Sequence, residues 1–172
     1  MEQGHNTRTL IDPDGNEIEI DLGISPLISE IWKANIKTIA CCENYYFEEG
    51  WIWIKLPVED AKKLLSILSE YDEDIHSLYN RIHRQINTDG YDIYEKEGEC
   101  AEGTWRYGVQ PRDLRRIERE VGDKTMNYIR LLSLDITFDI SVIFPTWDYD
   151  EVLRRIKEFN NERLYLQRIN DK

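Results

Sequence analysis

The sequence predicts a single α+β domain, in which a mixed, mainly antiparallel sheet is covered by helices and one helix is long and central. Alternation of apolar and polar residues, clearest at residues 136–144, predicts half-buried strands. Apolar residues spaced three and four apart, as in residues 59–87, predict helices. The 172 residues suit one domain, which begins with a polar arm or turn over residues 1–16.

Acidic residues outnumber basic ones by 34 to 22, which gives a formal net charge of −12. Such a surface repels the backbone of nucleic acids and anionic membranes, so we expect no general nucleic-acid binding and no membrane association. No apolar run approaches the length needed to cross a bilayer, and three cysteines give no framework of disulfides. These features predict a protein of the cytoplasm.

A strand and a helix are predicted near the N-terminus. The strand covers residues 18–22, where apolar and acidic residues alternate after a turn. Ser25 is a suitable N-cap and Pro26 a suitable first helical residue, and the apolar stripe that follows continues until Asn35. The helix is therefore expected to end at Asn35.

Two strands of different character are predicted next. Residues 38–42 read as a buried strand, and residues 51–56 form a strand that is apolar on both faces. A strand of the second kind lies in the centre of a sheet or is covered on its second face by a partner. Pro57 is expected to end it.

A long amphipathic helix is predicted over residues 59–87. If continuous, it would be roughly 40 Å long, which is more than a domain of this size needs. We therefore expect it to form an interface between subunits of a homo-oligomer. The alternatives are a break at residues 72–74 and packing within a single domain.

Further strands and a helix are predicted in the second half of the chain. Strands at residues 91–93 and 105–109 flank an acidic loop, and residues 112–121 predict a helix. In the last major strand, residues 136–144, apolar and polar side chains face opposite ways. Asp139 is therefore expected on a solvated face.

The C-terminal segment predicts a helix and a short strand. Asp148 and Glu151 have the spacing of a capping box, which places the start of a helix there. Residues 164–166 are expected to add a terminal strand. Together, the elements predict a sheet whose helices lie on one face.

Residues 35–44 read Asn-Ile-Lys-Thr-Ile-Ala-Cys-Cys-Glu-Asn. This segment resembles one in a scattered family of small, largely uncharacterised phage and bacterial proteins, which has a helix, a Gly-Ile-x-Thr-x-x-Ser-Cys-x-Gly strand and turn, and an aromatic second strand. Asn35 and Asn44 stand where the family has Gly, and Asn tolerates the left-handed backbone that Gly supplies; Cys41 replaces Ser. The resemblance implies this fold and a viral or mobile-element origin, without an established activity. Later strands of the family are similar to residues 105–111 and 140–145.

The cysteines, histidines and carboxylates do not complete a catalytic or metal site. A thiol nucleophile needs a nearby base, and nothing in the sequence places His76 or His83 beside Cys42. Asp135 and Asp139 could bind a divalent cation, but a solvated strand face is the simpler interpretation. We expect no catalytic residues, no metal and no cofactor.

Aromatic residues and arginines predict a ligand site instead. The chain has 5 Trp and 10 Tyr, many of them at strand ends and turns, where rings can stack on a planar base while arginines hold phosphates. On an alternating strand, Arg106 points away from both neighbouring aromatic residues, so a second subunit or the segment around Arg112 must complete the site. Packing in the core is the alternative for each ring, and a solvated helix face is the alternative for the arginines. The predicted ligand-binding residues are Cys42, Glu43, Tyr45, Tyr46, Trp105, Arg106, Tyr107, Arg112 and Trp147.

These features favour a binding protein without catalytic activity that sequesters a small anionic ligand of the nucleotide type. In the host cytoplasm, a viral protein of this kind could capture an immune signalling nucleotide and so evade antiviral defence. An alternative is an acidic inhibitor that binds a host defence protein and mimics DNA. A nucleotide-processing enzyme is the second alternative.

Overall fold

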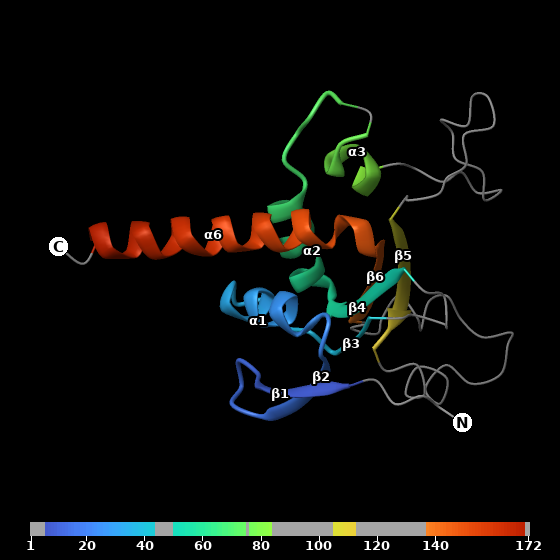
Figure 1. Cartoon of the computed structure of the whole chain (residues 1–172), viewed down its shortest axis with the longest axis vertical. Coiled ribbons are helices and arrows are strands. Elements are labelled where there is room, and N and C mark those ends of the chain that lie inside the picture. The colour runs from blue at the N-terminus through green and yellow to red at the C-terminus, as the bar shows by residue number, and fades with distance from the viewer. Residues whose placement is uncertain (1–5, 44–49, 75, 84–104, 113–136, 171–172) are drawn as a thin grey trace, which may run out of the picture.

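The computed structural model describes residues 6–43, 50–74, 76–83, 105–112 and 137–170. Figure 1 shows a sheet at the right, helices beside it and a separate hairpin of two strands at the bottom. The elements of the described segments are, in chain order, β1 (Thr7–Ile11), β2 (Glu17–Asp21), α1 (Ser25–Lys33), β3 (Ala40–Cys42), β4 (Trp51–Pro57), α2 (Val58–Leu68), α3 (Leu78–His83), β5 (Arg106–Pro111), β6 (Phe138–Pro145), the 3-10 helix η2 (Thr146–Asp148) and α6 (Tyr149–Asn170).

A four-stranded antiparallel sheet, in the order β3-β4-β6-β5, forms the centre of the fold. Strand β4 lies between β3 and β6, with Trp51 opposite Pro145 and Leu56 opposite Ile140. Its central place confirms the prediction made from its apolar residues. Strands β1 and β2 form a separate antiparallel pair. The predicted α+β class, with antiparallel strands and helices, is therefore confirmed.

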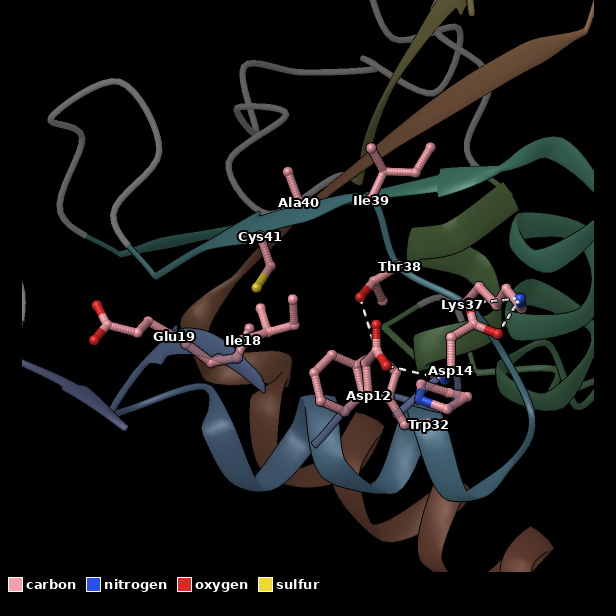
Figure 2. Close-up of a pocket in the computed structure, with 12 residues that line it drawn as sticks. Asp12, Asp14, Ile18, Glu19, Trp32, Lys37, Thr38, Ile39, Ala40 and Cys41 are labelled. Carbon is pink, nitrogen blue, oxygen red and sulfur yellow. Dashed lines mark hydrogen bonds and ion pairs between the residues drawn. The ribbon is translucent and has the colours of Figure 1, made fainter. Parts of the chain in front are cut away.

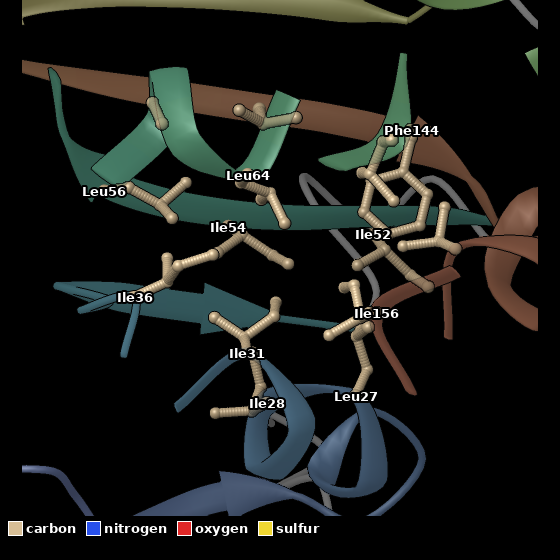
Figure 3. Packing of buried hydrophobic residues seen from close by; sticks show 14 of the residues in the cluster. Leu27, Ile28, Ile31, Ile36, Ile52, Ile54, Leu56, Leu64, Phe144 and Ile156 are labelled. Carbon is tan, nitrogen blue, oxygen red and sulfur yellow. The ribbon is translucent and has the colours of Figure 1, made fainter. Parts of the chain in front are cut away.

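One face of the four-stranded sheet carries the hydrophobic core (Figure 3). Along β4, Ile52, Ile54 and Leu56 are buried in this core, and the residues between them are only half-buried. This alternation follows from the two-residue period of a strand. Full burial of such a side chain stabilises the fold by about 1.5–3 kcal/mol. The helices α1, α2 and α6 contribute Leu27, Ile28, Ile31, Leu64 and Ile156.

Helix α1 is followed by a left-handed residue, as the sequence predicts. Asn35 has a φ of 56°, and the N–H of Ile36 donates to the carbonyl of Ile31 at 3.2 Å, which closes the end of the helix. The predicted N-cap is wrong. Ser25 is the first helical residue, and its hydroxyl donates to the carbonyl of Leu22 at 3.0 Å instead of capping an N–H.

The hairpin β1–β2 begins where a polar arm or turn was expected. Strand β1 pairs with β2 over its full length, and the connecting turn contains Gly15 with a φ of 88°. The carboxylate of Asp12 accepts the N–H groups of Asp14 and Asn16, which fixes the turn. Most of β1 is exposed. Its sequence therefore does not alternate between apolar and polar residues, which is the pattern that would have predicted a strand.

The continuous helix predicted over residues 59–87 is wrong, whereas the alternative, a break at residues 72–74, is confirmed. Helix α2 ends at Leu68, and the short α3 begins ten residues later. Between them, the carboxylates of Asp72 and Asp74 accept backbone N–H groups at 2.9 Å. Such local bonds compete with helix formation. Residues 84–87 lie outside the described part. Leu78 and Ile82 are buried within the chain, so they offer no apolar face to a second subunit.

The long helix of this fold is α6, with 22 residues. Val152 and Ile156 are buried, and the side-chain amide of Asn160 donates to the carbonyl of Glu30 on α1 at 3.0 Å. Residues 164–166, which were predicted to form a strand, belong to this helix and are exposed. The strand prediction is wrong because three adjacent apolar residues do not distinguish a strand from an exposed helical turn.

A buried carboxylate joins three separate parts of the chain. Asp148 is 1% exposed. Its oxygens accept Nε and Nη2 of Arg81 at 3.1 and 2.5 Å and Nε1 of Trp105 at 2.9 Å. Asp148 therefore holds η2 against α3 and the start of β5. The sequence predicts that Asp148 caps the start of α6. In the structure, its carboxylate accepts hydrogen bonds from the side chains of Arg81 and Trp105.

We expect Asp148→Ala to lower the free energy of unfolding by about 2–3 kcal/mol, because a guanidinium and an indole N–H lose their acceptor in a buried place. Urea denaturation measures this change. Asp150→Ala is the control, since Asp150 is an exposed carboxylate two residues away. Equal losses in the two variants would contradict the role of Asp148.

Glu151 connects the start of α6 to the end of α2. Its carboxylate accepts Nη2 of Arg154 at 2.7 Å and Nε of Arg155 at 2.8 Å. Arg155 in turn donates to the carbonyl of Leu68 at 2.7 Å. These bonds, first of all that from Arg154, lower the pKa of Glu151 from 4.5 to about 2.

A depressed folded-state pKa means that Glu151 stabilises the fold above pH 4.5 and loses this effect as the pH falls towards about 2. We expect Glu151→Gln to lose less stability than the wild type as the pH falls from 4.5 to about 2, because glutamine has no charge that protonation can remove. Urea denaturation at several pH values measures it, with Glu162→Gln on the exposed side of α6 as control. An unchanged pH dependence in Glu151→Gln would contradict the expectation.

Candidate functional site

The second face of the four-stranded sheet points away from the core. Because side chains alternate along β4, the residues between the buried isoleucines face this side. The pairing of β4 with β6, and of β6 with β5, places further polar residues beside them. We call this surface the second face. It comprises Trp51, Trp53, Lys55, Arg106, Gly108, Gln110, Arg112, Asp139, Ser141 and Ile143.

Arg106 lies over the ring of Trp51 at one end of the second face. Its guanidinium carbon is 4.2 Å from the ring centroid, which is a cation–π distance. The ring of Trp147 on η2 lies beside Trp51, with centroids 6.5 Å apart and an angle of 56° between the planes. Trp147 is 62% exposed. The structure thus brings two of the predicted residues, Arg106 and Trp147, to one place beside a second tryptophan, Trp51.

Trp51 was not among the predicted ligand-binding residues. In the sequence it is one apolar residue of a strand that is apolar on both faces. Its position beside Arg106 depends on the pairing of β4, β6 and β5, which are far apart in the chain. The available signal was only the two-residue period of a strand, which puts Trp51, Trp53 and Lys55 on the face opposite Ile52 and Ile54.

A charged cluster lies at the other end of the second face. Asp139 is 4% exposed and accepts Nε of Arg112 at 2.8 Å, with Nζ of Lys55 3.7 Å away. Lys55 also donates to the side chain of Gln110 at 3.2 Å. The solvated position predicted for Asp139 is therefore wrong, because two cations cover it. One carboxylate between two cations leaves a positive charge that could attract an anion.

Arg106 and Arg112 share the second face but lie at opposite ends of it. Six residues of an extended strand separate them, which corresponds to about 20 Å. Within one chain, a small molecule at Trp51 could therefore reach Arg106 but not Arg112.

Trp105 and Tyr107 point the other way, as the alternation predicts. Trp105 is buried and stacks on Phe144 in the core, with centroids 4.8 Å apart. The hydroxyl of Tyr107 donates to the carbonyl of Ile82 on α3 at 3.0 Å, and burial raises the pKa of Tyr107. These contacts place both rings on the core side of the sheet, away from Arg106.

Glu43 lies at a cavity of about 320 Å³ between the turn that joins β2 to α1, strand β4 and the start of α6. Its carboxylate accepts the N–H of Gly23 at 2.9 Å, and its own N–H donates to Asp21 at 3.0 Å. Asp150 also lines this cavity, so two carboxylates make it unfavourable for a phosphate. Cys42 is half-buried opposite Trp53 on β4. The predicted residues Tyr45 and Tyr46 lie outside the described part of the chain.

A second cavity, of about 330 Å³, lies between the β1–β2 hairpin and β3 (Figure 2). Trp32 closes one side, where its Nε1 donates to the hydroxyl of Thr38 at 2.9 Å, and an ion pair between Lys37 and Asp14 lies at the rim. The sulfur of Cys41 points into the cavity (Figure 2). Burial raises the pKa of Cys41 to about 12, so the thiol is protonated at neutral pH and is a poor nucleophile.

Among the described segments, no group of three or more histidine, cysteine or acidic side chains could hold a metal ion. Each helix there is also too short or too polar to span a bilayer.

Comparison with known proteins gives one informative match. The chain is 24% identical over 146 residues to uncharacterized protein R428 of Acanthamoeba polyphaga mimivirus. It is similar to a viral protein of unknown function. The match covers 84% of this chain and 64% of the mimivirus protein, so the chain spans less than two thirds of that relative. No protein-family model matches the chain, and no solved structure matches it.

We expect Cys41 to resist alkylation in the folded protein. With a pKa of about 12, roughly one Cys41 thiol in ten thousand is deprotonated near pH 8. Treatment with iodoacetamide followed by peptide mass spectrometry measures the modified fraction, and protein unfolded in urea is the control. Equally fast modification of Cys41 in folded and unfolded protein would contradict its burial.

Proposed function

We propose that this protein binds a small anionic ligand with a planar ring, such as a nucleotide, at Trp51, Arg106 and Trp147. The observation that supports this function best is the guanidinium of Arg106 over Trp51, with the exposed ring of Trp147 beside it. Trp147 can stack on a base, which contributes about 1–3 kcal/mol, and Arg106 can bond a phosphate through two N–H groups.

The charge of the chain makes Arg106 important for such binding. At −12, the surface as a whole repels an anion, so a local cation must compensate for this repulsion. Stacking on Trp51 also holds the guanidinium in one place before a ligand arrives. A fixed donor loses less conformational freedom on binding than a flexible one, which favours affinity.

The biological role that we propose is sequestration. Similarity to a mimivirus protein supports a viral setting. In a host cytoplasm, a viral protein that captures an immune signalling nucleotide without altering it would evade antiviral defence. Sequestration requires stacking and phosphate contacts but no nucleophile, and the protonated thiol of Cys41 agrees with this.

The acidic hairpin supports a second candidate function. Glu17 and Glu19 on β2 and Asp14 in the turn are exposed, and they present carboxylates on a small rigid element. A basic host protein could bind this surface as it binds DNA phosphates. Such an inhibitor would not need the cluster of Trp51, Arg106 and Trp147.

We expect Arg106→Ala to weaken nucleotide binding by about 10- to 100-fold, because a charge-assisted bond to phosphate is lost. Trp147→Ala should weaken it through lost stacking. Isothermal titration calorimetry with a panel of mono- and dinucleotides measures both effects. Arg168→Ala, an exposed arginine on α6, is the matched control and should bind as the wild type does.

Mass spectrometry of the ligand released by denaturation separates the candidate functions. Release of an unchanged nucleotide supports sequestration, and release of an altered one supports an enzyme. If no nucleotide binds, or if Arg106→Ala and Trp147→Ala both bind as the wild type does, the ligand proposal fails. The acidic inhibitor is then tested by reversing the charges of Glu17 and Glu19 and measuring binding to a basic protein.

A further inference from the structure

Strand β5 lies at one edge of the four-stranded sheet, and no strand in the described part of the chain pairs with its outer side. The N–H of Arg112 donates to the carbonyl of Thr137 at 2.9 Å. In an antiparallel ladder, residues whose backbone groups bond one neighbouring strand alternate with residues whose backbone groups point to the other side. Gly108 is four residues from Arg112, so its backbone groups also bond β6. The backbone groups of Tyr107 and Val109 therefore point outward. Their side chains are 41% and 63% exposed.

We propose that two copies of this chain join edge to edge along antiparallel β5 strands, with the twofold axis at Gly108. In this register, Tyr107 of each copy lies opposite Val109 of the other, and the two pairs exchange four backbone hydrogen bonds. An aromatic ring opposite a β-branched side chain is a favourable cross-strand pair. The dimer thus covers the exposed edge groups of β5 and its most exposed apolar side chain.

The sequence of β5 selects this register over the neighbouring one. With the axis at Gly108, Arg106 lies opposite the neutral Gln110 of the second copy. The two glycines meet at a non-bonded pair, where strands approach most closely. With the axis at Val109, Arg106 would oppose Arg112, and Tyr107 would oppose Pro111, which has no N–H to donate.

Charge also favours β5 as the contact between copies. Two chains of −12 repel each other through most of their surface. Strand β5 carries no acidic residue, and its one charge, Arg106, faces a neutral residue in the proposed pair. A meeting of two copies along this strand therefore avoids the repulsion that the rest of the surface imposes.

The dimer would also bring the two ends of the second face together. Arg112 of one copy becomes the diagonal neighbour of Arg106 of the other, at about 7–8 Å, whereas about 20 Å separates them within one chain. A ligand with two anionic groups, such as a dinucleotide, could then contact both arginines. This consequence rests on the proposed function, but the dimer itself does not.

Cross-linking tests the position of the axis. In Gly108→Cys, the two cysteines would lie about 4.5 Å apart between Cα atoms, within the range of a disulfide. A Cβ at Gly108 meets Cβ of Ser141 at 3.4 Å, an ordinary contact, so the variant should fold. Mild oxidation should give a covalent dimer on a non-reducing gel. Gln110→Cys and the wild type are the controls, and cross-linking no greater than in these controls would overturn the register.

Light scattering tests the dimer itself. The wild type should have twice the mass of one 20.6 kDa chain at micromolar concentration. Val109→Pro removes an outward N–H and spares the ladder with β6, so association should weaken by about 10- to 100-fold, while Val109→Thr should remain dimeric. Circular dichroism checks that Val109→Pro is folded.

A monomeric wild type would overturn the dimer, and so would a folded Val109→Pro that associates as the wild type does. Titration calorimetry with nucleotides tests the proposed function independently of the dimer. A monomer that binds nucleotides would leave the proposed function intact, whereas a dimer that binds none would remove the function and leave the interface.

Discussion

Strand β4 separates the hydrophobic core from the second face, and most of the structure depends on its register. Its isoleucines and Leu56 are buried against three helices, so a slip by one residue would move them out and bring Trp51, Trp53 and Lys55 into the core. The large cost of that exchange fixes the pairing with β6. Through β6 it also fixes β5, and so it sets Arg106 over Trp51.

The carboxylate of Asp148 gives the site its second support. Trp147 precedes it in η2, and Arg81 and Trp105 hold it from α3 and from the start of β5. A residue next to such an anchor has little freedom, which explains how Trp147 can be exposed and still occupy a defined place beside Trp51. Packing and candidate binding are therefore coupled through adjacent residues.

The sequence predicted those features that depend on local period and local backbone. It predicted the central position of β4, the opposite directions of Arg106 and Trp105, and the left-handed Asn35 after α1. It failed where one pattern suits two structures. Apolar spacing continues across the break between α2 and α3. The spacing of Asp148 and Glu151 correctly placed the start of α6, but it did not reveal that Asp148 is a buried acceptor for Arg81 and Trp105. The meeting of Trp51 with Arg106 depends on strand pairing between distant segments, which no local pattern contains.

Arg106 belongs to an otherwise acidic protein, and this has a consequence for selectivity. Repulsion from a net charge of −12 grows with the number of phosphates that approach, whereas Arg106 can contact only the phosphates beside it. A small ligand with one to a few phosphates would meet a modest barrier at the tryptophans. A long polyanion such as RNA would bring many phosphates near the carboxylates of the hairpin and would be repelled. The charge distribution of the proposed binding protein would therefore discriminate between ligands by their total charge.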